Sequence, residues 1–263
     1  MIRSSLRATL VVACAAVASC GGAESTEPYT PESAVRIAGA PAGWFAGSSM
    51  APPSYSYGVD HTNKRSGTSS AYLTALTSLP VQGFGVVAQQ LRADNYRGKR
   101  VRWSGWVAHK GILGGAGGGL WMRVDGPGTI QSFDNMLTRP LTGDASWHEA
   151  GVVLDVPANA IGIAFGFLLD GYGDLNADEL KLEVVGTNIP STNLLVLGSQ
   201  PAGADSAAIA RSYANSAKDP VNLGFESVAG LSDLSPVYLR VGEMSVARAT
   251  PPVALRLRSR PRG

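Results

Sequence analysis

The fold class follows from residues 101–107, VRWSGWV, in which apolar and polar side chains alternate. Successive side chains of a β-strand point to opposite faces of its sheet, so an alternation with a period of two predicts a strand. One face carries Val101, Trp103 and Val107, and the other carries Arg102, Ser104 and Trp106. We expect the first set to face a core.

Two other stretches alternate in the same way. In residues 120–125, LWMRVD, the inward side chains are Leu120, Met122 and Val124, and the outward ones are Trp121, Arg123 and Asp125. In residues 178–185 the inward side chains are Leu180, Leu182 and Val184, between the charged Glu179, Lys181 and Glu183. Both stretches predict strands with one buried face.

Composition and spacing extend this prediction to a whole domain. Only 16% of the 263 residues are charged, against about 25% in an average domain, and the chain contains 32 Gly and 16 Pro. Short apolar runs punctuated by turn residues predict further strands near residues 54–60, 69–76, 83–91, 147–156 and 160–169. The sequence therefore predicts an all-β, antiparallel jelly-roll β-sandwich over residues 36–187.

The glycine-rich residues 111–119 lie between two predicted strands. They lack the Gly-Lys-Ser/Thr ending of a phosphate-binding loop, so we expect a flexible hairpin loop here.

The first residues have the pattern of an export signal. Arg3 and Arg7 precede an apolar run over residues 8–18, which is too short to span a bilayer as a mature helix. The following VASC, residues 17–20, resembles the bacterial lipobox, and this resemblance implies that Cys20 is acylated and becomes the mature N-terminus. An ordinary signal peptide cut nearby is the alternative. We expect a lipoprotein signal peptide at 1–19 and a tether at 20–35.

The lipobox resemblance also predicts a location. Acyl chains such as palmitate on Cys20 anchor a protein to a membrane without spanning it. We therefore expect a lipid-anchored protein of the cell envelope, in the cell membrane or the outer membrane, facing the periplasm or the exterior. The formal net charge of +2 gives no electrostatic reason to expect a nucleic-acid partner.

The C-terminal region, residues 188–263, has a different composition. It lacks steady periodicity and ends rich in Arg and Pro, which predicts a linker and a mostly disordered tail. Within it, residues 206–218 predict a short helix with Ile209 and Tyr213 on one side.

A series of motifs resembles a known module. The motifs are YRGKRVRWSGWV (96–107), GLWMRVDG (119–126), SFDNM (132–136), Arg139-Pro140, Trp147, LDVP (154–157), IGIAFGFLLDGYG (161–173) and DELKLEVVG (178–186). In this order they resemble a bacterial galactose-binding-like jelly-roll module, similar to carbohydrate-binding modules, over about residues 40–187. The resemblance implies a jelly-roll fold, a binding function and a structural Ca²⁺ near Asp178.

The sequence departs from that module at two places. Asn176 stands where an aromatic residue is usual, and the common Asn-Leu-x-Phe-Glu opening is missing at the start. PVNLGFE, residues 220–226, looks like that opening. Its position predicts the beginning of a truncated second module.

The motifs of common catalytic sites are missing. The chain has no Gly-x-Ser-x-Gly and no His-Glu-x-x-His, and no two of His61, His109 and His148 stand at metal-ligand spacing. Asp170 and Asp174 flank a Gly-Tyr-Gly turn, where aspartates are ordinary. We therefore expect a protein that is not an enzyme and has no cofactor, with the structural Ca²⁺ left open.

Two tryptophans on outward faces are the candidate ligand site. An aromatic face can pack on the apolar side of a sugar while neighbouring charged or amide groups bond its hydroxyls. The candidates are Arg102 with Trp106, Trp121 with Arg123 and Asp125, and also Asp134 with Asn135 in SFDNM. For Asp134 and Asn135 the alternative is an Asx turn, and for the tryptophans it is burial beneath loops.

Two functions fit these residues. One is a non-catalytic, lipid-anchored module that binds carbohydrate or a similar polar ligand on a sheet face. The other is an interaction or scaffold module whose exposed face binds an envelope protein.

Overall fold

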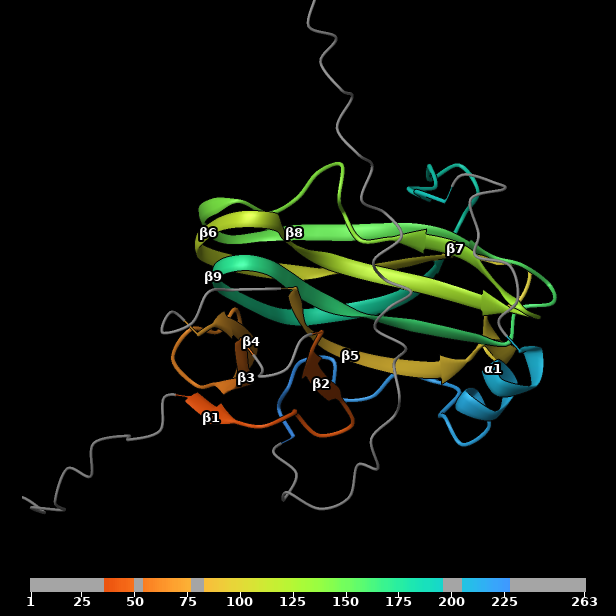
Figure 1. Cartoon of the computed structure of the whole chain (residues 1–263), viewed down its shortest axis with the longest axis horizontal. Coiled ribbons are helices and arrows are strands. Elements are labelled where there is room, and N and C mark those ends of the chain that lie inside the picture. The colour runs from red at the N-terminus through yellow and green to blue at the C-terminus, as the bar shows by residue number, and fades with distance from the viewer. Residues whose placement is uncertain (1–35, 50–53, 77–82, 196–204, 228–263) are drawn as a thin grey trace, which may run out of the picture. The chain divides into compact units, whose positions relative to one another are not determined.

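The computed structural model describes residues 36–49, 54–76, 83–195 and 205–227 (Figure 1). The predicted signal peptide, Cys20, the tether and the Arg-rich end of the chain lie outside the described residues. Within the described ranges, no helix is both long and apolar enough to cross a membrane.

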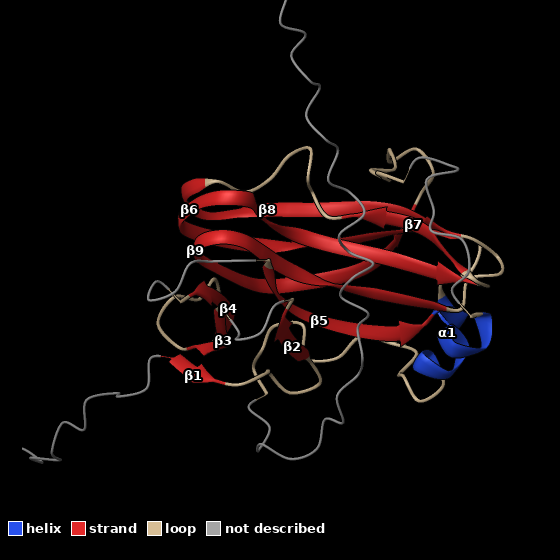
Figure 2. Cartoon of the chain, viewed as in Figure 1, coloured by secondary structure: helices blue, strands red, loops and turns tan. Residues whose placement is uncertain are grey.

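The described part is built of antiparallel strands, shown in red in Figure 2. The strands are β1 (Arg36–Ala38), β2 (Phe45–Ser48), β3 (Tyr55–Asp60), β4 (Ser70–Ala75), β5 (Phe84–Arg92), β6 (Lys99–Gly126), β7 (Thr129–Asp134), β8 (Gly143–Val156) and β9 (Gly162–Val185). A short 3-10 helix, η1 (Ala93–Asn95), and the helix α1 (Ser206–Tyr213) complete the described elements.

Two long strands, β6 and β9, run through both layers of the sandwich. The first part of β6, residues 99–113, pairs with β8 and with residues 172–185 of β9. The last part, residues 117–126, pairs with β7 and with residues 162–170 of β9. One layer thus has the order β8-β6-β9-β4-β3-β1 and the other the order β7-β6-β9-β5-β2. The predicted antiparallel β-sandwich of jelly-roll type is confirmed.

The glycine-rich stretch is where β6 bends from one layer into the other. We predicted a flexible hairpin loop over residues 111–119, but these residues lie inside the continuous β6. Gly115 has φ +58°, and a Cβ atom there would lie 2.3 Å from the Asp170 side chain of β9. Gly171 on β9 has φ +120° and packs equally closely on the Gly114 carbonyl. Glycines let both strands bend together here, with an irregular register between Lys110 and Gly117, and the regular pairing resumes at Gly117.

The core between the layers is aromatic. Its largest fully buried side chains include Trp44, Trp103, Phe165, Phe167 and Phe225. The ring centroids of Trp103 and Phe165 lie 4.7 Å apart, within the usual range for packed aromatic pairs.

The alternation of side chains predicted most of this core correctly. Val101, Trp103 and Val107 are fully buried, and so are Leu120, Met122 and Val124. The inward prediction was wrong for Val184, which is 52% exposed because β9 is close to its end there.

An ion pair fastens the short edge strand β1 to β3. Arg36 Nε lies 2.8 Å from Asp60 Oδ2. Burial raises the pKa of Asp60, but the hydrogen bonds from the Asn63 backbone N–H and from Arg36 outweigh it and hold that pKa at about 2. Asp60 is therefore ionised over the whole neutral range.

Residues 205–227, which we call the C-terminal arm, pack on the sandwich. The predicted short helix is confirmed as α1, with Tyr213 buried against β6. Further along the arm, the Trp44 indole N–H donates to the Asn222 carbonyl at 3.1 Å, and Phe225 is fully buried 5.1 Å from the Trp44 ring. We predicted a mostly disordered tail and a second module here. Phe225 instead completes the core of this domain.

Candidate functional site

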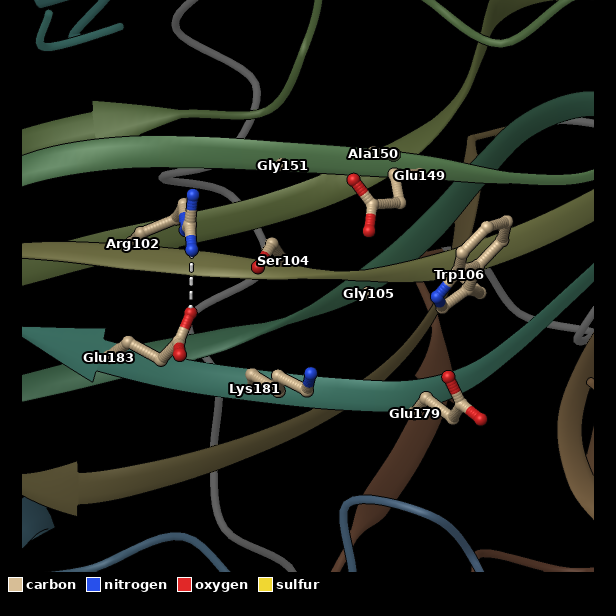
Figure 3. A pocket seen from close by; sticks show the side chains of 10 residues that line it. All are labelled: Arg102, Ser104, Gly105, Trp106, Glu149, Ala150, Gly151, Glu179, Lys181 and Glu183. Carbon is tan, nitrogen blue, oxygen red and sulfur yellow. Dashed lines mark hydrogen bonds and ion pairs between the residues drawn. The ribbon is translucent and has the colours of Figure 1, made fainter. Parts of the chain in front are cut away.

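A groove crosses the outer face of the layer that contains β8, β6 and β9 (Figure 3). It encloses about 350 Å³. Its lining residues are Arg102, Ser104, Gly105 and Trp106 of β6, Glu149, Ala150 and Gly151 of β8, and Glu179, Lys181 and Glu183 of β9. The groove thus presents the outward side chains of three adjacent strands.

Strand register brings these residues together. Trp106 pairs with Glu149 of β8, and Ser104 pairs with Lys181 of β9. Ser104 also pairs with Gly151, where a Cβ atom would lie 3.1 Å from the Ser104 Cβ. The small residue at 151 therefore keeps the middle of the groove open.

The groove carries charges of both signs. Arg102 Nη2 lies 2.9 Å from Glu183 Oε2, and both side chains are partly exposed (Figure 3). Among the described residues, no ion pair engages Glu149, Glu179 or Lys181. The groove thus offers hydrogen-bond donors and acceptors that the fold itself does not occupy.

The aromatic group of the groove is Trp106, which is half-buried at one end. The Arg65 guanidinium lies 4.2 Å from the centroid of the Trp106 ring. Arg65 belongs to the loop between β3 and β4, residues 61–69. A cation within about 6 Å of a ring face is attracted by the ring quadrupole, so this contact holds loop and ring together.

Asp178 fixes the same loop from β9. Its Oδ2 accepts the backbone N–H groups of Arg65 at 2.9 Å and Ser66 at 3.1 Å, and its Oδ1 accepts the Glu179 N–H at 2.7 Å. Burial raises the pKa of Asp178 above its usual value. Both oxygens of the carboxylate that we considered for Ca²⁺ therefore accept hydrogen bonds from backbone N–H groups. In the described ranges, no group of three or more His, Cys, Asp or Glu side chains could hold a metal ion.

Trp121 does not belong to an open site. It is fully buried on the outer face of the other layer, among Val86, Phe133 and Leu168. Its prediction as a ligand-binding residue was wrong, because apolar neighbours cover the ring. The alternative of burial thus holds for Trp121, whereas Trp106 lines the groove.

Arg123 and Asp125 are also removed from the candidate site. Arg123 Nη2 lies 2.9 Å from Asp125 Oδ2, and the Tyr213 hydroxyl donates to the same oxygen at 2.6 Å. The three side chains are all at least nine-tenths buried. They join α1 to β6 and cannot meet a ligand.

Asp134 and Asn135 form a turn, which was the alternative to ligand binding. The buried Asp134 accepts the Met136 backbone N–H through Oδ1 at 2.8 Å. Its Oδ2 forms an ion pair with Arg139 Nη2 at 2.6 Å. Asn135 Oδ1 accepts the Leu137 N–H at 3.2 Å. Of the residues that the sequence proposed for ligand binding, only Arg102 and Trp106 line the groove.

Sequence reasoning missed most of the remaining groove residues. Glu179, Lys181 and Glu183 were correctly placed on an outward face, but no local pattern predicts the register of β9 against β6. Glu149 lies in a predicted strand and was not recognised for the same reason. Arg65 reaches Trp106 only through tertiary structure.

The chain was also compared with known proteins. No family model matches it. It is 36% identical, over 185 residues, to the uncharacterized HTH-type transcriptional regulator YbfP of Bacillus subtilis (strain 168). The match covers 70% of this chain and 56% of YbfP. The chain thus spans about half the length of this curated relative.

Two solved structures are similar to the described domain. The Stig cyclase Fisc from Fischerella sp. TAU is 13% identical, with a TM-score of 0.42, and the match covers 60% of this chain and 92% of that one. The CBM22-1 xylan-binding domain of Paenibacillus barcinonensis Xyn10C is 17% identical, with a TM-score of 0.40, and the match covers 57% of this chain and 90% of that one.

Proposed function

We propose that the domain is a non-catalytic module that binds carbohydrate or a similar polar ligand in the groove on β8, β6 and β9. The observation that carries this proposal is the position of Trp106 at one end of a groove whose walls hold both donors and acceptors. The apolar face of a sugar ring can pack on the part of the indole that Arg65 leaves uncovered, and its hydroxyls can bond to Glu149, Lys181 or Glu179. The volume of about 350 Å³ lies within the usual range for small-ligand pockets, roughly 300–1,000 Å³.

The charge balance favours an uncharged ligand. Arg102 pairs with Glu183, which leaves one cation, Lys181, and two carboxylates, those of Glu149 and Glu179, along the groove. A strongly anionic or cationic ligand would meet like charges at short range. A neutral sugar can use both kinds of hydrogen-bonding group. The series of motifs along residues 96–186 resembles that of galactose-binding-like modules, and this resemblance supports the same class of function.

Glycan-array screening followed by calorimetric titration of the glycans that bind tests this function. Trp106→Ala should weaken binding at least about tenfold, which corresponds to about 1.4 kcal/mol. Trp121→Phe is the matched control, because it alters a tryptophan outside the groove. Glycan binding that Trp106→Ala leaves intact would contradict the site. A wild-type protein that binds no glycan but captures an envelope protein would favour the interaction module instead.

We also propose that the module is anchored by lipid on Cys20. This proposal rests on the lipobox-like VASC at residues 17–20. Cys20→Ala, or inhibition of the lipoprotein signal peptidase by globomycin, should leave an unprocessed precursor in the membrane fraction. Normal maturation in either experiment would refute lipidation.

A further inference from the structure

Trp106, at one end of the groove, is contacted by a loop that the C-terminal arm holds. The loop is residues 61–69, and its Arg65 covers the Trp106 ring at 4.2 Å. Asp178 binds the middle of the loop through two backbone N–H groups. The end of the loop is bound by a second carboxylate, that of Glu226 in the arm.

Glu226 makes several contacts with the loop. Its two carboxylate oxygens lie 3.1 and 3.0 Å from the Thr68 backbone nitrogen, and Oε2 also accepts the Thr68 hydroxyl. The loop approaches Glu226 so closely at Gly67, where φ is +60°, that a Cβ atom would lie 1.8 Å from Oε1. Carboxylate hydrogen bonds of this kind are stronger than neutral ones. They lower the pKa of Glu226, so it is ionised at neutral pH.

Glu226 is itself held in place by the core. The neighbouring Phe225 is fully buried, and its carbonyl accepts the Ser69 hydroxyl at 2.8 Å. Two residues earlier, the Leu223 carbonyl accepts the backbone N–H of Leu180 at 3.1 Å. Leu180 lies on β9 between the groove residues 179 and 181. The end of the arm is therefore a fixed support between the groove strand β9 and the loop.

From these contacts we propose that Glu226 is a positioning residue for the groove. It holds the 61–69 loop so that Arg65 lies against Trp106, and the affinity of the groove depends on the C-terminal arm. The part of this proposal that concerns affinity rests on the proposed function. The part that concerns the loop stands independently of any ligand.

Amide hydrogen exchange of the full chain, followed by mass spectrometry, tests the loop directly. In Glu226→Ala the peptide that contains residues 61–69 should exchange about tenfold faster or more. The loop then opens more easily, because the hydrogen bonds between Glu226 and Thr68 no longer have to be broken. Glu226→Gln keeps one acceptor oxygen and should give an intermediate increase. The matched control is Asp219→Ala, which removes another arm carboxylate, one that accepts from the Asn95 side chain at 2.8 Å. It should leave exchange of the loop unchanged.

A purely structural role would give a different result. Faster exchange throughout β5 as well as the loop would mean that Glu226 supports the stability of the whole domain. Unchanged exchange of the loop would mean that Glu226 does not hold the loop in place. Either result overturns the proposal.

Titration with xylohexaose, a neutral oligosaccharide, tests the second part. Glu226→Ala should weaken its binding about threefold or more while the urea midpoint of unfolding changes little. If Glu226→Ala loosens the loop but leaves affinity unchanged, the dependence of affinity on the arm is refuted. A wild-type protein that does not bind xylohexaose speaks against the proposed function for that sugar, and the exchange experiment still decides the role of Glu226.

Discussion

Removing one hydroxyl should reveal whether the C-terminal arm is part of the folded domain. The Tyr213 hydroxyl donates to Asp125 Oδ2 at 2.6 Å, and Tyr213 is 2% exposed. Burial, together with the nearby Asp125 charge, raises the pKa of Tyr213 well above its usual value, so the hydroxyl remains a donor at neutral pH. Tyr213→Phe removes this donor and changes the packing very little.

The size of the effect follows from what Asp125 retains. Its Oδ2 still accepts from Arg123, with Nη2 at 2.9 Å and Nε at 3.1 Å, so the carboxylate is not left unpaired. The cost is therefore below the 3–5 kcal/mol of a broken buried ion pair. A buried hydrogen bond to a charged group contributes about 1.5–3 kcal/mol. We expect Tyr213→Phe to lower the free energy of unfolding by that amount.

Urea denaturation measures this loss as a decrease of about 1 M in the midpoint, with an unchanged slope. Tyr172→Phe is the matched control, since Tyr172 is 39% exposed and its hydroxyl has no hydrogen-bond partner among the described residues. The control should change stability by less than about 0.5 kcal/mol. If the two variants are equally stable, α1 does not dock on β6 in solution and the folded arm is refuted.

Three further predictions concern stability. Gly162→Ala should destabilise the domain, because its Cβ atom would lie 2.3 Å from the Tyr213 ring, and most of the loss should disappear in a Tyr213→Ala background in a double-mutant cycle. Phe225→Ala should cost about 3–5 kcal/mol in urea denaturation, whereas the exposed Val221→Ala should cost less than about 0.5 kcal/mol. The pKa of Asp60, held at about 2, makes the folded state bind this proton less tightly than the unfolded state. Its contribution of roughly 2 kcal/mol should therefore be lost as pH falls from about 4 to 2, and Asp60→Asn should flatten that part of the pH–stability curve.

The sequence predicted the faces of the strands better than their lengths. Alternation identified the core-facing side chains because a strand has a fixed period of two. It treated residues 111–119 as a break, since glycine usually ends a strand pattern. In the structure these glycines allow a bend with shifted register, after which pairing resumes with Gly117 opposite Asp170. A local pattern cannot distinguish these outcomes, because the partner strand decides between them.

The candidate site was predicted in part for a related reason. Trp106 and Trp121 occupy equivalent outward positions in two alternating stretches, yet one lines a groove and the other is fully buried. The residues that cover an outward side chain come from distant parts of the sequence. Asp125, for example, meets Tyr213, which lies 88 residues later. Alternation cannot predict such cover.

The partner strands nevertheless explain why the open groove lies on one layer. Beside Trp121 the outward positions are apolar, as at Val86 and Leu168, so this surface is stable only when it is covered. Beside Trp106 the outward positions of β8 and β9 are charged, as at Glu149 and Lys181, so this surface can stay in water. An outward tryptophan therefore becomes a candidate ligand platform only when the strands on both sides carry polar residues at the paired positions.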